Sequence, residues 1–484
     1  MNVKQKYHGG KVMDNKCVWN KYNATQLKEL ESFTKEFIDF ISECKTEREC
    51  VEKIVNDIEK EGYVDISKVI KSGKKLKAGD KVYSVKMNKS IIMANIGTDK
   101  LEDGVNILGA HLDSPRLDVK ANPLYEDNGL AYLDTHYYGG IKKYQWVTIP
   151  LAIHGVVAKK DGTTVIVNLG EEEDDPVFFI SDLLIHLSSE QLEKKAAKVI
   201  EGEALDLIVG NKPIKAETNS KSKKDKEDKE EKDAVKKSVL DILKKYYDIE
   251  EEDFLSAELE IVPAGRAKEA GFDRSMVLGY GQDDRVCAFP SYKAMLKVKK
   301  VKRTAVCILT DKEEIGSVGA TGMQSQLFEN VMAELLNLCD DYSEIKLKRM
   351  LANSNMLSSD VSSAFDPSYA SSFDKKNVAY LGKGMVLCKF TGSRGKSGSN
   401  DANAEYLGTL RGIFAKDDVQ FQLAELGKVD LGGGGTIAYM LAKYGMNVID
   451  CGVAVLNMHA PYEATSKADI YETYRGYISF VKNM

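Results

Sequence analysis

The order of hydrophobic and polar residues predicts helices first and strands afterwards. Apolar side chains recur at three- and four-residue intervals from Leu27 to Ile41, which predicts an amphipathic helix. A second helix is expected from Thr46 to about Lys60, because Glu49 stands three positions after Thr46 as in a capping box. Three short apolar runs, KVYSVKM, SIIMANIG and VNILGAHLD, then predict strands. Helices and strands in this order indicate an α/β layer structure.

The pattern changes between residues 119 and 262. QWVTIPLAIHGVVAKK and TTVIVNLG are strand-like runs separated by turn signals, and helical pieces are expected near 181–200 and 236–247. The mixed-charge run near 218–233 contains no apolar residue, which is typical of a solvated loop.

After residue 275 helical and strand-like segments alternate again. SYKAMLKV, FENVMAELLNLC and TIAYMLAKYG predict helices, and TAVCILTD and NVIDCGVAVLNMH predict strands. The simplest account is one α/β domain formed by 1–118 and 263–484 and interrupted by an inserted β-rich domain, 119–262.

Composition narrows the class of protein. The formal net charge of −6 over 484 residues argues against nucleic acid as the main partner. The chain contains no run of about 18 apolar residues, so the sequence predicts no membrane span. The first twenty residues do not resemble a secretory signal. The eight cysteines form no CxxC pair and several lie in apolar runs, which favours reduced thiols and a cytoplasmic location.

Apolar strand-like runs end repeatedly in residue types that bind metal ions. The segments that carry them are GAHLDSP (His111, Asp113), QDDRVC (Asp283, Asp284), DKEEIGS (Glu313, Glu314), SSDVSSAF (Asp360) and NMHAPYE (His459, Glu463). Because sites in α/β sheets assemble at the carboxyl ends of strands, we expect these segments to converge.

Histidines with several carboxylates suit two divalent ions, Zn²⁺ with Mn²⁺ or Co²⁺ as possible substitutes. Two close ions need a shared carboxylate and open positions for water and substrate. Within the Glu-Glu pair, one glutamate can bind a metal while the other accepts a proton from the attacking water.

These motifs, in this order, resemble the M18 metallopeptidase family, which comprises the aspartyl aminopeptidases and the yeast-type vacuolar aminopeptidases. The resemblance covers nearly the whole chain and includes DTHYYGG and IPLAIHG. It implies an α/β catalytic domain with a mixed sheet flanked by helices, interrupted by a β-rich dimerisation domain. It also implies a zinc aminopeptidase that hydrolyses the N-terminal peptide bond of peptides.

The resemblance also implies roles for individual residues. His111 and Asp360 would bind one ion, and His459 and Glu314 the other. Asp284 would bridge both ions, chosen over Asp283 because of its spacing to the following RVC.

Three further residues would act without binding metal. Glu313 would be the general base, and Asp113 would hold the imidazole of His111 in its ligating tautomer. His154 would reach the active site of a neighbouring subunit. Members of the family form dodecamers built from dimers, so self-association is expected.

The preferred substrate stays open. Lys383, Lys389, Arg394 and Lys396 could attract an acidic N-terminal residue, or they could be ordinary surface cations. Some family members prefer neutral or apolar residues. The glycine-rich 430–440 segment is expected to let backbone approach the substrate.

Three other functions compete with an aminopeptidase. A co-catalytic metal deacylase would use the same ligands and accept N-acetylated substrates. A non-catalytic assembly protein would have lost a ligand, and none is missing. A serine hydrolase is disfavoured because the chain has no GxSxG motif.

Overall fold

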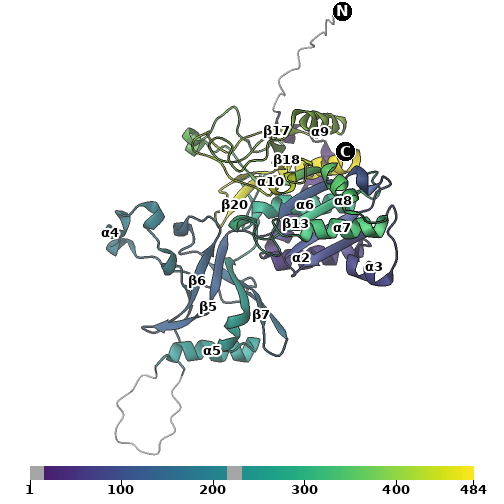
Figure 1. Cartoon of the computed structure of the whole chain (residues 1–484). Helices are drawn as coiled ribbons and strands as arrows, with labels where there is room; N and C mark the ends of the chain where they lie inside the picture. The colour runs from purple at the N-terminus through teal and green to yellow at the C-terminus, as the bar shows by residue number, and fades with distance from the viewer. Residues whose placement is uncertain (1–15, 215–231) are drawn as a thin grey trace, which may run out of the picture.

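The computed structural model describes residues 16–214 and 232–484 of the chain, so most of the predicted charged loop, 218–231, lies outside the described residues. The largest sheet has nine strands (Figure 1). In spatial order they are β1 (Val64–Asp65), β2 (Lys81–Lys86), β3 (Ser90–Asn95), β13 (Ala305–Thr310), β4 (Asn106–His111), β14 (Asn355–Ser359), β18 (Asn447–Gly452), β16 (Met385–Cys388) and β17 (Phe421–Leu423). The four central strands β13, β4, β14 and β18 are parallel, so their carboxyl ends meet at one edge.

Helices cover both faces of this sheet. One face packs against α1 (Ala24–Glu43), α2 (Glu47–Lys60), α6 (Gln282–Lys297), α9 (Ala404–Lys416) and α11 (Lys467–Asn483). The other face packs against α3 (Ile66–Ser72), α7 (Leu327–Cys339), α8 (Glu344–Ala352) and α10 (Ala438–Ala442). Alternate residues of β4 join the two cores, Leu108 the first and Ile107 the second, as the two-residue period of a strand requires. The predicted α/β class is confirmed.

The predicted capping box at the start of α2 is confirmed. The Thr46 hydroxyl accepts from the backbone N–H of Glu49 at 3.2 Å, and the Glu49 carboxylate accepts from the N–H of Thr46 at 2.9 Å. These bonds satisfy amides that a helix start would otherwise leave unpaired.

A second, six-stranded sheet is antiparallel and lies to one side of the first (Figure 1). Its strands, in spatial order, are β8 (Thr164–Leu169), β7 (Leu151–Ala158), β10 (Ala257–Pro263), β5 (Arg116–Asp127), β6 (Leu130–Tyr138) and β9 (Leu207–Gly210). Helix α5 (Ala234–Tyr247) packs on it through Val239, Leu240 and Leu243. These strands come from the β-rich part of the sequence, and the division into domains stays a prediction.

The helix predicted near 181–200 is wrong in extent. The only α-helix within it is the one-turn α4 (Ser189–Leu192), flanked by short 3₁₀ turns. Leu184, Ile185 and Leu187 are exposed, so no apolar face packs to stabilise a longer helix.

A small five-stranded sheet completes the fold. In spatial order it contains β11 (Lys268–Ala270), β12 (Met276–Gly279), β20 (Glu463–Ser466), β19 (Ala454–Leu456) and β15 (Ser362–Ser363). Strands β12, β15, β19 and β20 begin or end at segments that carry predicted ligands. Among the described residues, no helix is both long and apolar enough to cross a membrane.

Candidate metal centre

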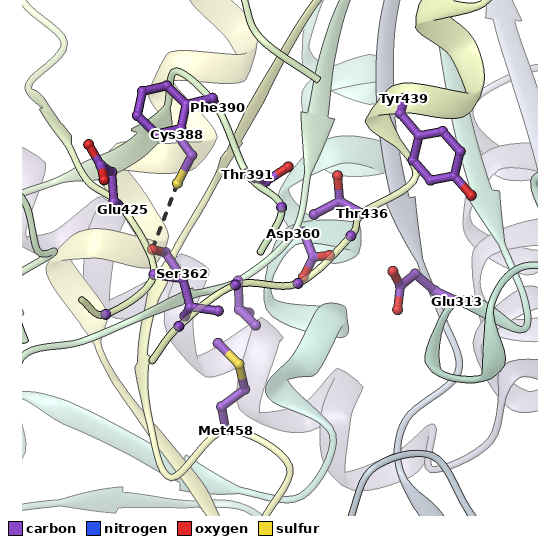
Figure 2. Close-up of a pocket in the computed structure, with 18 of the residues that line it drawn as sticks. Glu313, Asp360, Ser362, Cys388, Phe390, Thr391, Glu425, Thr436, Tyr439 and Met458 are labelled. Carbon is purple, nitrogen blue, oxygen red and sulfur yellow. Dashed lines mark hydrogen bonds between the residues drawn. The ribbon is translucent and has the colours of Figure 1, made fainter. Parts of the chain in front are cut away.

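The ends of three central strands and of β19 in the small sheet bring most of the predicted ligands together. His111 is the last residue of β4, Asp360 follows β14, and His459 follows β19. Glu313 and Glu314 stand in the turn after β13. All but His111 line a cavity of about 890 Å³, and Figure 2 shows Glu313 and Asp360 pointing into it.

The carboxylate of Asp283 lies between the two histidines. Its Oδ1 is 3.3 Å from Nε2 of His111, and its Oδ2 is 3.2 Å from Nε2 of His459. Nε2 of His459 is also 3.4 Å from Oε2 of Glu314. The potential ligand atoms form two sets, and within each set all atoms lie within 4.8 Å of one another. One set comes from His111, Asp283 and Asp360, and the other from Asp283, Glu314 and His459. Asp283 belongs to both.

This geometry favours Asp283 over Asp284 as the shared carboxylate. Asp284, predicted to bridge, belongs to neither set. It is fully buried, and its Oδ2 accepts a hydrogen bond from the backbone N–H of His111 at 3.3 Å. The backbone is non-helical at Asp283 and Asp284 within the first turn of α6, so the two side chains take different directions.

The electrostatics of the cluster fit a bound cation. Burial raises the pKa of Glu313 to about 7 and holds the pKa values of Glu314 and Asp360 well above their usual range. Burial would also raise the pKa of Asp283, but its contacts with His111 and His459 outweigh burial and lower it. Oδ1 of Asp283 and Oε1 of Glu314 are buried and accept no hydrogen bond from the described residues. Buried carboxylate oxygens without donors suit divalent ions such as Zn²⁺.

Asp113 lies beneath the ligands and is fully buried. Its Oδ1 accepts from the backbone N–H of Glu313 at 3.1 Å, and its Oδ2 accepts from that of Glu314 at 3.2 Å. Nδ1 of His111 is 2.9 Å from the Asp113 carbonyl oxygen and 3.3 Å from its carboxylate. Asp113 therefore contacts His111 as expected, and also the turn that carries both glutamates.

Sequence reasoning missed several residues that contact the predicted ligands or Asp113. The hydroxyl of Tyr138 donates to Oδ2 of Asp113 at 2.8 Å, and the carbonyl of Gly140 is 2.8 Å from Nδ1 of His459. Glu463, noted in the sequence without a role, accepts from the backbone N–H of Asp283 at 3.0 Å and of His459 at 2.8 Å. The THYYGG motif was the only sequence signal for the first two.

His154 lies outside the metal centre of its own chain, and its predicted role in a neighbouring subunit's site stays a prediction. The side chain is fully buried in β7. Nδ1 is 2.8 Å from Oε1 of Glu49, and Nε2 is 3.1 Å from Oε1 of Glu171. Both ring nitrogens are therefore within hydrogen-bond distance of carboxylates of the same chain.

The end of the cavity away from the metal ligands has mixed charge. Of the four cations considered from the sequence, Arg394 and Lys396 are the ones that line it. Nζ of Lys396 is 3.1 Å from Oδ2 of Asp401 and 3.7 Å from the centre of the Phe390 ring. Glu425 lies on the side opposite Glu313, beside Phe390 and Cys388 (Figure 2).

The glycine-rich segment also lines this cavity. Gly432, Gly433 and Gly434 form part of its wall, as expected for backbone that approaches a substrate. The ideal position of a Cβ on Gly433 lies 2.4 Å from the Gly392 carbonyl oxygen, and φ is +136°. A side chain at this position would therefore force the wall open.

Comparisons with known proteins agree on one family. The model of the family described as "Aminopeptidase I zinc metalloprotease (M18)" matches residues 40–481. The "Probable M18 family aminopeptidase 1" of Clostridium acetobutylicum is 61% identical over 468 residues, which cover 97% of this chain and 98% of that protein.

Solved structures show the same fold. The crystal structure of an M18 aminopeptidase from Thermotoga maritima superposes with a TM-score of 0.90 at 42% identity, covering 98% of this chain and 100% of that one. The S. cerevisiae mApe1 dodecamer matches with a TM-score of 0.71 at 21% identity, covering 92% and 95% respectively.

Proposed function

The chain belongs to the M18 family of zinc metallo-aminopeptidases, and we propose that it acts through two divalent ions held at the strand ends. His111, Asp283 and Asp360 would hold one ion, and Asp283, Glu314 and His459 the other. The single observation that carries this proposal is the position of the Asp283 carboxylate between the two histidines. The N/O ligand set fits Zn²⁺, and Mn²⁺ or Co²⁺ would substitute.

The ions would supply Lewis acidity toward the scissile carbonyl and the attacking water. Glu313 lines the cavity and belongs to neither ligand set, so its carboxylate is free to accept a proton from that water. Burial keeps the pKa of Glu313 near 7, which suits a group that takes up and returns a proton at neutral pH. Asp113 holds the Glu313 and Glu314 amides and so fixes the position of this base.

For the substrate, we propose a peptide whose N-terminal side chain enters the cavity end lined by Cys388, Phe390 and Thr391. A neutral or apolar side chain is favoured, because Lys396 is already paired with Asp401 and the Glu425 carboxylate would repel an acidic one. Arg394 also lines the cavity and supports the second candidate, an acidic (Asp or Glu) side chain.

A panel of aminoacyl chromogenic substrates tests this function. We expect chelation to abolish hydrolysis and Zn²⁺, Mn²⁺ or Co²⁺ to restore it. Leucyl and alanyl substrates should be cleaved faster than aspartyl and glutamyl ones. N-acetylated versions should be inert, whereas a deacylase would accept them. Fewer than about one ion per chain in fully active enzyme would contradict a two-ion scheme.

We further propose that the chain self-associates in the cytoplasm, as a homo-dodecamer built from dimers. The S. cerevisiae relative is a dodecamer. The segment 177–192 projects from the six-stranded sheet around α4 and exposes several large apolar side chains, which favours burial against another subunit (Figure 1). All eight cysteines are free thiols, as a reducing compartment would keep them.

A further inference from the structure

The end of strand β6 reaches from the six-stranded sheet into the metal centre. Tyr138, the last residue of β6, donates its hydroxyl to Oδ2 of Asp113 at 2.8 Å. The same carboxylate accepts from the amides of Glu313 and Glu314 and lies 3.3 Å from Nδ1 of His111. Through Asp113, Tyr138 is therefore linked to His111 and Glu314, a predicted ligand of each ion, and to the predicted base Glu313.

The six-stranded sheet fixes the ring of Tyr138. The guanidinium of Arg116, its cross-strand neighbour on β5, lies 3.9 Å from the ring centre. Arg116 is itself held by Asp118 at 2.8 Å and by Glu260 of β10 at 3.1 Å. Burial and the adjacent Asp113 carboxylate raise the pKa of Tyr138 well above its usual value. The hydroxyl therefore stays protonated and acts as the hydrogen-bond donor to Asp113.

The two residues after Tyr138 lie beside the second ligand set. The Gly140 carbonyl accepts from Nδ1 of His459 at 2.8 Å, which leaves Nε2 facing Asp283 and Glu314. Gly139 has a φ of +77°, which favours glycine, and the ideal position of a Cβ there lies 3.4 Å from Oε2 of Glu314.

We propose that Tyr138, Gly139 and Gly140 form a strut through which the six-stranded sheet positions both ligand sets of the metal centre, with Tyr138 acting through Asp113. Tyr138 is a positioning residue, since it touches neither ligand atoms nor substrate. The inference rests on the proposed two-ion function and adds that residues of the β-rich sheet tune ion affinity. Groups that hold metal ligands from behind typically contribute 10–100-fold to affinity or activity.

The variant Tyr138→Phe tests the strut, because it removes one hydroxyl and keeps the ring that packs on Arg116. Metal-free full-length protein would be titrated with Zn²⁺ against a chromogenic chelator, and kcat and KM measured separately. We expect Zn²⁺ to bind ~10–100-fold more weakly and kcat to fall, with KM nearly unchanged. Tyr137→Phe is the matched control: this neighbouring ring is 42% exposed, and the variant should behave as the parent does. Equal Zn²⁺ affinity in the two variants would overturn the proposal.

A double-mutant cycle tests the route through Asp113. In an Asp113→Ala background, or Asp113→Asn if the alanine variant does not fold, Tyr138→Phe should weaken Zn²⁺ binding no further. The same fold-loss in both backgrounds would show that Tyr138 does not act through Asp113 and would overturn this inference. Failure of the two-ion function is recognised separately, because the unaltered chain itself would then bind fewer than about two ions.

Discussion

At the residue scale, Asp283 and Asp284 are neighbours in the chain but lie in different surroundings. Asp283 faces both histidines, whereas Asp284 is turned toward the backbone of His111. Both are buried, so each carboxylate needs its own compensating partner. Two closely spaced cations would compensate the first, and the His111 amide donates to the second.

This difference predicts opposite results for two matched variants. Asp283→Asn should retain at most about one ion per chain, because two close cations need a shared anionic ligand. Asp284→Asn should keep both ions, since its amide carbonyl can still accept from the His111 N–H. Metal content after gel filtration, measured by elemental analysis, distinguishes the variants. The reverse pattern would restore Asp284 as the bridging residue.

A second prediction at this scale concerns Glu313, which lines the cavity outside both ligand sets. Glu313→Gln should keep both ions and lose ~10²–10⁴-fold in kcat, the usual contribution of a positioned proton acceptor. Its matched control is Glu314→Gln, which should lose metal because Glu314 approaches His459 at 3.4 Å. If Glu313→Gln loses metal instead, the roles of the two glutamates are exchanged.

The sequence was sufficient to nominate these residues but not to orient them. Each nominated ligand follows an apolar run, and the carboxyl ends of parallel strands meet by topology alone. The choice between Asp283 and Asp284 depends on the non-helical backbone of these two residues inside the first turn of α6. The spacing of apolar residues does not predict such a local departure from a helix. For His154 the sequence could not show the contacts with Glu49 and Glu171, because an apolar strand with one histidine looks the same whether its partner is a substrate or a buried glutamate.

At the element scale, four charged side chains at the start of α2 contact residues in or next to the six-stranded sheet. Lys45 contacts Glu171, Glu47 contacts Arg116, Arg48 contacts Glu258 and Glu49 contacts His154. Because all of these pairs except Arg48–Glu258 are largely buried, the junction between the two sheets is polar and its geometry is specific.

The His154 pair makes this junction testable. His154→Phe leaves the Glu49 and Glu171 carboxylates without their shared partner, and we expect a loss of about 3 kcal/mol, the lower end for breaking a buried pair. Thermal unfolding measures the loss, and His136→Phe, at an exposed position of β6, is the control. Normal stability with an altered kcat would instead revive a direct role for His154 in the reaction.

The same pair predicts a pH dependence. Burial alone would lower the pKa of His154, but hydrogen bonds to Glu171 and Glu49 raise it. Those bonds also lower the pKa values of both glutamates, despite the opposing effect of burial. Lys45, beside Glu171, and Glu260, opposite His154 on β10, are the other charged groups nearby.

Linkage fixes the sign of the effect. The contribution of His154 is complete below its unfolded pKa of about 6.5 and is lost as the pH rises through the raised folded value. The contribution of the glutamates is present above about 4.3 and is lost at lower pH. The stability difference between the parent and His154→Phe should therefore be larger at pH 6 than at pH 9. A difference that grows toward pH 9 would contradict a protonated His154.

The spacing of apolar residues predicted helices and strands correctly where the predicted apolar face packs against the rest of the chain. The first two helices and the central strands follow their predicted segments because each buries one face or both. In the segment 181–200, Leu184, Ile185 and Leu187 are exposed and bury no apolar face, so the predicted helix does not form there.

At the scale of the whole molecule, the exposed apolar segment 177–192 predicts how the chain assembles. The double variant Ile185→Asp, Leu187→Asp should shift the molecular mass toward smaller species, because charged side chains resist burial at an interface. The residues replaced are 69% and 66% exposed, so the chain itself should still fold. Light scattering coupled to gel filtration measures the mass.

Ile345→Asp, on α8 and 55% exposed, is the matched control and should leave the mass unchanged. An unchanged mass in the double variant would show that 177–192 is not part of a subunit interface.

The interrupted topology has a consequence for biosynthesis. Asn106 of β4 pairs with Ala305 and Asn355, and Phe33 of α1 stacks on Tyr474 of α11 at 4.2 Å. The nine-stranded sheet therefore cannot close until nearly the entire polypeptide has left the ribosome. The six-stranded sheet uses strands from residues 116–263 alone and can form during translation. A nascent chain would thus carry the finished Tyr138 strand end before the last ligand, His459, is synthesised, and proteolytic activity would be withheld until synthesis is complete.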